Sequence, residues 1–193
     1  DMDCEKARQE LRIPKGKKVI LYAPTWRENQ HLPGEGYQFQ LPVDFKRWQE
    51  VLGDEYVILF RAHYFISNSF DFQAFSGFVY DVSQMDDINP LYLAADVLIT
   101  DYSSVFFDYA NLRRPILFFM YDYEQYKHEM RDFYFDIHTL PGPVLMDQEE
   151  MLKTLKNLPD VVDKYEKKYA EFNNVFNPHR EQCSEKYLRD WMK

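Results

Sequence analysis

The residues of this chain that could do chemistry stand directly after runs of apolar residues. They are Thr25 and Arg27 after the first run, Arg61 and His63 after the second, Asp81 and Ser83 after the third, and Asp101, Ser103 and Ser104 after the fourth. If these runs are parallel strands, their carboxyl ends meet at one edge of a sheet, where open α/β sheets bind ligands. Arginines, a histidine and hydroxyls together suit a pyrophosphate better than a carboxylic acid or an apolar ligand.

The stretch 96–109 is the most informative part of the chain. It reads as a strand that ends at Asp101, followed by Ser103 and Ser104 at the start of an amphipathic helix. Backbone N–H groups and short side chains gather at such a junction, which makes it an anion site. Serine is also a good N-cap, so a capped helix without a ligand is the alternative interpretation. Asp101 is likewise either a ligand or an ordinary capping carboxylate.

His63 is open to two interpretations. A single histidine at a strand end can be a satisfied structural residue, or it can act on a ligand near neutral pH. Because His63 lies beside Arg61 and is expected opposite the serine pair, the functional interpretation is favoured.

A further group of rings and charges follows the fifth predicted strand. It forms either a solvated helical face or a stacking wall for a base or ribose. Its members are Tyr121, Asp122, Tyr123, Tyr126, Arg131, Tyr134 and Asp136.

Several classes of protein do not fit the sequence. It lacks a Walker or dinucleotide-type glycine fingerprint, which argues against ATPases and dehydrogenases. It also lacks an HExxH motif or a histidine–carboxylate array, so we expect neither a metal nor a cofactor. The net charge of −9 argues against a nucleic-acid partner, since such binding draws on clustered Lys and Arg. Cys4 and Cys183 have no metal-ligand or disulfide spacing, which fits a reducing, cytoplasmic setting.

Strands alternate with helices along most of the chain, which predicts an α/β fold with a parallel sheet. The predicted strands are 18–25, 56–63, 77–82, 97–101, 115–121 and 144–146, and the predicted helices are 1–11, 44–52, 88–95, 103–112 and 147–158. We expect a lead-in helix over 1–16, a Rossmann-like nucleotide-donor-binding domain over 17–158 and a helical tail of the same domain over 159–193. Residues 26–43 are predicted as a long loop, which in a compact domain is usually functional or mobile. The chain has no apolar run long enough for a membrane span, and it reads as a piece of a longer protein.

The strings that carry this pattern resemble the CDP-glycerol glycerophosphotransferases, which build poly(glycerol phosphate) and related teichoic acids in Gram-positive bacteria. They are Tyr-Ala-Pro-Thr-Trp-Arg at 22–27, Leu-Phe-Arg-Ala-His at 59–63 and Asp-Val-Leu-Ile-Thr-Asp-Tyr-Ser-Ser at 96–104. The resemblance covers about residues 17–146. It implies one Rossmann-like half of a GT-B fold that binds CDP-glycerol, or another CDP-polyol, in an interdomain cleft.

The resemblance also assigns roles. His63 would contact the diphosphate and assist the departure of CMP. The expected substrate-binding residues are Thr25, Arg27, Arg61, Ser83, Asp101, Ser103, Ser104 and Arg131. Arg131 is followed by Asp132, where the family commonly has glycine. The family's presumed base is a histidine of an N-terminal domain outside this chain, so this piece alone is expected to be inactive.

The sequence therefore predicts a transferase that moves glycerol phosphate, or a related polyol phosphate, to a growing polymer hydroxyl with release of CMP. The full-length enzyme is expected at the inner face of the cell membrane as a peripheral protein, where its N-terminal domain would meet a membrane-anchored acceptor. Two rivals remain. One is the donor-binding domain of a GT-B glycosyltransferase that uses a UDP- or GDP-sugar, and the other is a non-catalytic nucleotide-binding module.

Overall fold

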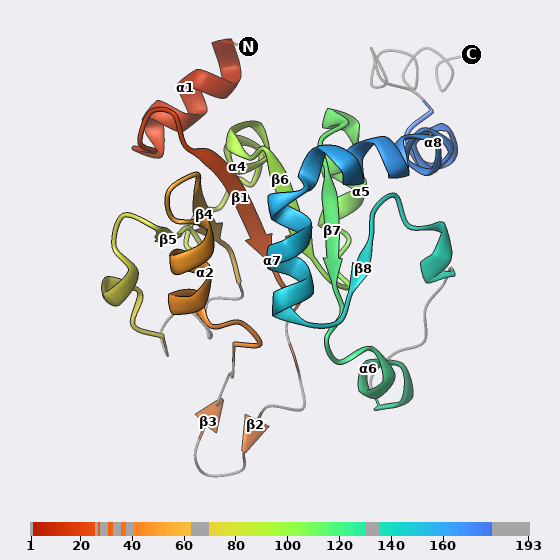
Figure 1. Cartoon of the computed structure of the whole chain (residues 1–193), viewed down its shortest axis with the longest axis horizontal. Coiled ribbons are helices and arrows are strands. Elements are labelled where there is room, and N and C mark those ends of the chain that lie inside the picture. Colours follow the sequence, from red (N-terminus) through yellow and green to blue (C-terminus); the bar gives the residue numbers. More distant parts are fainter. Residues whose placement is uncertain are drawn as a thin grey trace, which may run out of the picture.

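The computed structural model describes residues 2–25, 27, 31–32, 36–37, 41–62, 70–129 and 136–178. Its main feature is a parallel sheet of six strands in the order β5-β4-β1-β6-β7-β8 (Figure 1). The strands are β1 (Lys18–Ala23), β4 (Tyr56–Phe60), β5 (Val79–Asp81), β6 (Val97–Thr100), β7 (Ile116–Phe119) and β8 (Val144–Leu145). The prediction of a parallel sheet flanked by helices is confirmed.

The register of the central strands brings their ends level. Tyr22 of β1 pairs with Phe60 of β4, and Ala23 pairs with Thr100 of β6. The residues that follow these strands therefore emerge at one edge of the sheet, the lower edge in Figure 1. Most strands are a few residues shorter than predicted, because the polar residues after them leave the ladder and bond elsewhere.

Both faces of the sheet are buried, because successive strand residues point to opposite sides. Ile20, Tyr22 and Ile58 belong to one apolar cluster, together with residues of the helices α2 (Phe45–Leu52) and α7 (Gln148–Lys156). Val19 and Leu21 belong to the other, with residues of α4 (Asn89–Ala94) and α5 (Val105–Tyr109). Figure 1 shows α2 and α7 on the near face of the sheet.

Two aspartates begin helices as the sequence predicts. The Asp44 carboxylate accepts the N–H groups of Lys46 and Arg47 at 2.9 and 3.3 Å, at the start of α2. The Asp147 carboxylate accepts the Glu150 N–H at 2.9 Å at the start of α7. Both are side-chain N-caps, which satisfy N–H groups that the helix itself leaves unpaired.

The lead-in helix α1 (Met2–Glu10) is tied to the sheet through one carboxylate. The Arg8 guanidinium lies 2.7 Å from Asp96, whose carboxylate also accepts the Val19 N–H at 2.7 Å. Asp96 is therefore structural.

The long helix α8 (Leu158–Phe176) passes along the amino edge of the sheet, at the top of Figure 1. Leu158 and Val161 pack against the first apolar cluster, whereas Phe172 belongs to the second. The helix therefore closes this edge. The tail beyond residue 178 lies outside the described residues.

Two predicted segments differ in detail. The predicted helix 103–112 is α5 followed by a 3-10 turn, Ala110–Leu112. The predicted loop 26–43 contains a short antiparallel pair, β2 (His31–Leu32) and β3 (Gly36–Tyr37). The chain after residue 121 forms α6 (Tyr123–Glu129), and further 3-10 turns lie at Phe72–Phe75 and Ile137–Thr139.

Candidate functional site

Three of the predicted site residues meet at the carboxyl edge of the sheet. The Asp101 carboxylate follows β6, and its Oδ1 accepts the Thr25 backbone N–H at 2.8 Å and the Thr25 hydroxyl at 2.5 Å. The same oxygen accepts the N–H of Tyr102 at 2.6 Å, while Oδ2 accepts Nη2 of Arg27 at 2.9 Å. Asp101 is only 2 % exposed. Its carboxylate thus joins the segments that follow β1 and β6.

Arg27 is 2 % exposed and is held by two carboxylates. Its Nε and Nη2 donate to Asp122 at 2.6 and 3.2 Å, Nη2 also donates to Asp101, and Nη1 donates to the Thr25 carbonyl at 2.7 Å. Burial by itself lowers the pKa of Arg27, but the hydrogen bond to Asp122 and the charge of Asp101 outweigh it and raise the pKa above its ordinary value. The guanidinium therefore stays charged and paired.

Aromatic rings surround this guanidinium. Its Cζ lies 5.1, 5.5 and 5.4 Å from the ring centroids of Tyr102, Tyr121 and Tyr126. The Tyr102 and Tyr126 rings stack with centroids 3.6 Å apart, and the Tyr102 hydroxyl donates to Asp122 at 3.0 Å. Two rings of the group predicted to form either a solvated face or a stacking wall, Tyr121 and Tyr126, thus pack around an arginine, and Tyr126 also stacks on Tyr102, which was not in that group. Arg131 and Tyr134 of that group lie outside the described residues.

Arg61 and Ser83 form a second group, at the ends of β4 and β5. Arg61 Nη1 donates to the Met85 carbonyl, and the Ser83 hydroxyl oxygen accepts the Ala62 N–H at 3.1 Å. The Ser83 N–H in turn donates to the Asp81 carboxylate at 3.0 Å. These bonds fix the turn after β5 against the residue that directly precedes His63 in the sequence. His63 itself lies outside the described residues.

The serine pair stands at the start of α5 without capping it well. Ser104 occupies the N-cap position in helical geometry, with φ −67° and ψ −8°, and makes no side-chain cap hydrogen bond. The Ser103 hydroxyl accepts the Val105 N–H at 3.5 Å, a long contact. The alternative interpretation of a serine-capped helix therefore fails for Ser104. Within the described part of the chain, neither serine hydroxyl donates a hydrogen bond, so each can donate to another acceptor.

The sequence reasoning did not select Asp122 and Tyr102 as site residues. Asp122 follows β7 by three positions, and the sequence placed it only in the group expected to form a solvated face or a stacking wall. The rule that selected the other residues, applied to this fifth strand, assigns it to the site. Tyr102 lies between two selected residues, Asp101 and Ser103, but a tyrosine in this position gives no signal of its own.

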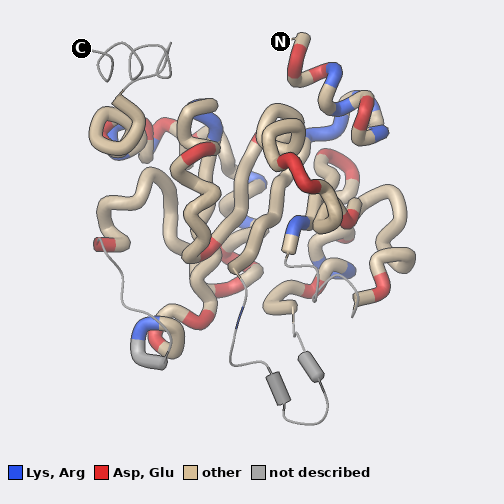
Figure 2. Tube along the Cα trace, turned by 180° about the vertical axis from the view of Figure 1, so that it is seen from behind, with Lys and Arg blue, Asp and Glu red and all other residues tan. Residues whose placement is uncertain are grey.

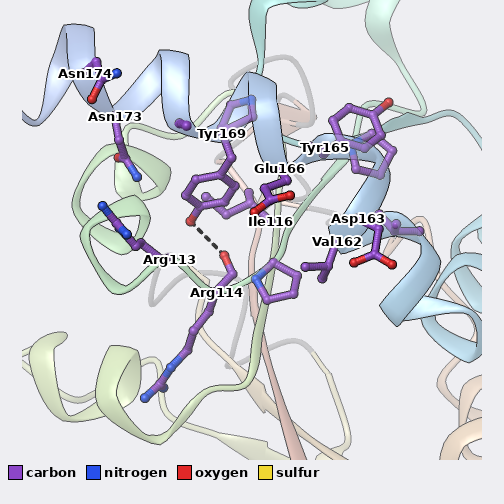
Figure 3. A pocket seen from close by; sticks show the side chains of 16 residues that line it. Arg113, Arg114, Ile116, Val162, Asp163, Tyr165, Glu166, Tyr169, Asn173 and Asn174 are labelled. Carbon is purple, nitrogen blue, oxygen red and sulfur yellow. Dashed lines mark hydrogen bonds between the residues drawn. The ribbon is translucent and has the colours of Figure 1, made fainter.

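A pocket of about 360 Å³ lies at the opposite edge of the sheet, between α8 and the start of β7 (Figure 3). In its wall the Tyr169 hydroxyl donates to the Arg114 carbonyl at 2.7 Å. The pocket contains none of the predicted site residues.

Other features of the described residues bear on function. They contain no cluster of three His, Cys, Asp or Glu side chains that could hold a metal ion. In the same part of the chain, no helix is long and apolar enough to cross a membrane. Acidic and basic positions are interspersed along the described trace (Figure 2).

Comparison with known proteins identifies the family. The sequence profile of the CDP-Glycerol:Poly(glycerophosphate) glycerophosphotransferase family matches residues 1–191. The chain belongs to this family. The resemblance inferred from the strings at 22–27, 59–63 and 96–104 is thereby confirmed.

Curated relatives act on two polyols, according to their names. The chain is 44 % identical over 170 residues to the teichoic acid poly(glycerol phosphate) polymerase of Bacillus subtilis, which covers 88 % of this chain and 23 % of the relative. It is 43 % identical over 154 residues to the teichoic acid poly(ribitol-phosphate) polymerase of Bacillus spizizenii, with 79 % and 24 % covered. The chain thus spans about a quarter of the length of these relatives.

Solved structures agree with the fold. The wall teichoic acid polymerase TagF superposes with a TM-score of 0.88 at 40 % identity, over 99 % of this chain and 46 % of TagF. A variant of TagF has also been solved after soaking with CDPG. The UDP-GlcNAc 2-epimerase of Neisseria meningitidis superposes with a TM-score of 0.55 at 13 % identity, over 97 % of this chain and 48 % of that enzyme, which shows a shared fold. This chain is therefore one half of a GT-B-like architecture.

Proposed function

We propose that this chain is the donor-binding region of a teichoic acid polyol-phosphate transferase, and that its donor is CDP-glycerol or CDP-ribitol. The observation that carries the proposal is the Thr25–Asp101 junction. It joins the strings 22–27 and 96–104, which are far apart in the sequence, at the edge of the sheet where ligands of this fold bind. The named relatives, which include glycerol- and ribitol-phosphate polymerases, support the class of donor.

The proposed reaction is a phosphoryl transfer. A hydroxyl of the growing polymer attacks the β-phosphorus of the CDP-alcohol, a new phosphodiester bond forms, and the bond to the departing CMP breaks. The proton of the attacking hydroxyl passes to a base outside this chain. Charge spreads over the phosphate oxygens in the transition state, so preoriented hydrogen-bond donors supply the main stabilisation.

We assign several residues as donors for that charge. Ser103 and Ser104 have hydroxyl hydrogens and lie at the carboxyl end of β6. Arg61 and Ser83 flank the end of β4, where His63 follows and would assist the departure of CMP. Arg131 completes the proposed set. Thr25, Arg27 and Asp101, which join the segments after β1 and β6, lie between these two groups of donors.

The proposal extends to the full-length protein of which this chain would be one part. Its acceptor would be a membrane-anchored teichoic acid bound through an N-terminal domain, at the inner face of the cell membrane. This chain alone would bind the donor without turning it over, because the base would be supplied by the other domain.

Calorimetric titration of the full-length protein tests the proposal. CDP-glycerol, CDP-ribitol, UDP-glucose and CMP are titrated in turn. Tighter binding of a CDP-alcohol than of UDP-glucose supports the proposal. Preference for UDP-glucose would favour a sugar transferase instead, and failure to bind any of the four would favour a non-catalytic module.

A further inference from the structure

The guanidinium of Arg27 has almost no hydrogen-bonding capacity left for a ligand. Of its five N–H donors, four are used by the hydrogen bonds to Asp122, Asp101 and the Thr25 carbonyl. The faces of the group are also occupied, because the three tyrosine rings described above lie within 5.5 Å of its Cζ. With 2 % of its surface exposed, Arg27 is enclosed by the protein itself.

We infer that Arg27, held by Asp122 and Tyr102, is a positioning residue of the donor site and does not bind the diphosphate. This inference rests on the proposed function, and it replaces the role of phosphate ligand that the sequence indicated for Arg27. To reach a phosphate, the guanidinium would have to leave two carboxylates uncompensated, one of them fully buried. Such a rearrangement is costly, because a buried charge without its partner keeps its desolvation penalty.

The network sets the geometry of the site through Asp101. Arg27 holds Oδ2 of this carboxylate, which leaves Oδ1 to accept the backbone N–H groups of Thr25 and Tyr102. Tyr102 directly precedes Ser103. The hydrogen bond of its backbone amide to Asp101 therefore fixes the position of the backbone at the proposed phosphate donors Ser103 and Ser104. Through its hydrogen bonds with Arg27, Asp122 joins the segment after β7 to the segments after β1 and β6. Three strand ends are thereby locked together before any donor binds, which is the preorganisation that phosphoryl transfer requires.

The substitution Asp122→Asn separates the two roles of Arg27 by the sign of its effect. If Arg27 were a phosphate ligand, removal of a competing carboxylate would free it, and the affinity for CDP-glycerol would rise. If Arg27 is a positioning residue, loss of the paired charge loosens the three segments, and we expect the affinity to fall about tenfold. Arg27→Lys keeps the charge but loses the planar fork that pairs with two carboxylates. A positioning role therefore predicts that this variant also binds CDP-glycerol more weakly than the wild type.

A milder variant, Tyr102→Phe, keeps the inference testable if Asp122→Asn fails to fold. Tyr102→Phe removes only the hydroxyl that donates to Asp122 and keeps the ring stacked on Tyr126. We expect it to weaken CDP-glycerol binding in the same direction as Asp122→Asn, but by a smaller factor. Tyr169→Phe is the matched control. It removes a hydroxyl that donates to the Arg114 carbonyl at the opposite edge, so donor affinity should stay at the wild-type value.

A second measurement needs no ligand. Amide hydrogen exchange is followed at Thr25 and Tyr102 in the ligand-free full-length protein. Asp122→Asn and Tyr102→Phe should accelerate exchange at both amides at least fivefold, and Tyr169→Phe should not. Unchanged exchange in both variants, or tighter CDP-glycerol binding by Asp122→Asn, would overturn the inference. If the wild type bound no CDP-alcohol, the proposed function would fail, and the exchange rates would still decide whether Arg27 positions these segments.

Discussion

Thr25 and Asp101 are 76 positions apart in the sequence, yet the Asp101 carboxylate accepts both the backbone N–H and the hydroxyl of Thr25. We expect Asp101→Ala to lower the free energy of unfolding by about 3–5 kcal/mol, because it leaves Arg27 buried beside a lost partner and two amides unpaired. Thr25→Val removes only the hydroxyl and should cost about 1 kcal/mol. Urea denaturation followed by tryptophan fluorescence measures both. Equal losses for the two variants would contradict this account of the carboxylate.

His63→Ala tests the residue proposed to act on the leaving group. Removal of one transition-state donor typically costs about 10²–10³ in rate, so the full-length enzyme should lose most of its CMP release. The melting temperature should stay within a few degrees of the wild type, because the preceding residue, Ala62, is held by the hydrogen bond from its N–H to the Ser83 hydroxyl oxygen. A large drop in stability with activity intact would show that His63 is structural.

The double substitution of Ser103 and Ser104 by alanine tests the proposed diphosphate contact. Because Ser104 makes no cap hydrogen bond and Ser103 makes only a long one, the change in stability should be below about 0.5 kcal/mol. CDP-glycerol binding should weaken more than the binding of cytidine, which carries no phosphate. Isothermal titration of both ligands into wild type and variant measures the difference. Equal losses for the two ligands would remove the phosphate role.

Gly142→Ala tests the packing of the amino edge, away from the donor site. A Cβ at this position would lie 1.8 Å from the Ile116 carbonyl oxygen, a backbone atom that no side-chain rotation can move. We expect a loss of about 3 kcal/mol in the free energy of unfolding. Gly16→Ala is the control. Its φ of +83° adds backbone strain of about 1 kcal/mol, but a Cβ there meets nothing within 4 Å. A smaller loss for Gly142→Ala than for Gly16→Ala would contradict the close approach.

Buried tyrosines make the fold sensitive to alkali. Burial raises the pKa of Tyr92 and Tyr121 to about 12, and it raises the pKa of Tyr22, Tyr102 and Tyr109 as well. In the unfolded chain these phenols titrate near pH 10, so the unfolded state loses protons first. The contribution of these phenols to the free energy of unfolding should therefore be fully present below about pH 10 and should be lost as the pH rises toward 12. Urea denaturation at several pH values, with absorbance at 295 nm to follow phenolate, measures this. Constant stability between pH 9 and 11 would argue against neutral buried phenols.

Much of the fold follows from local sequence. The apolar runs at 18–23, 56–60 and 97–100 are short and rich in β-branched and aromatic residues, which is typical of strands buried on both faces. The aspartates at 44 and 147 mark helix starts because their carboxylates satisfy free N–H groups. The direction of parallel strands then sends Thr25, Arg61, Ser83 and Asp101 to one edge without any knowledge of strand order. This is why the candidate site could be located from the sequence.

The tertiary structure decided what each of these side chains faces. An arginine after a strand can meet a phosphate or a carboxylate, and its own neighbours in the sequence do not distinguish them. Arg27 is paired because the strand order places β1 next to β6 and β6 next to β7, which brings carboxylates from 74 and 95 positions away within 3 Å. Local composition sets where a polar residue emerges from a sheet, whereas its partner is set by long-range pairing, which no local pattern encodes.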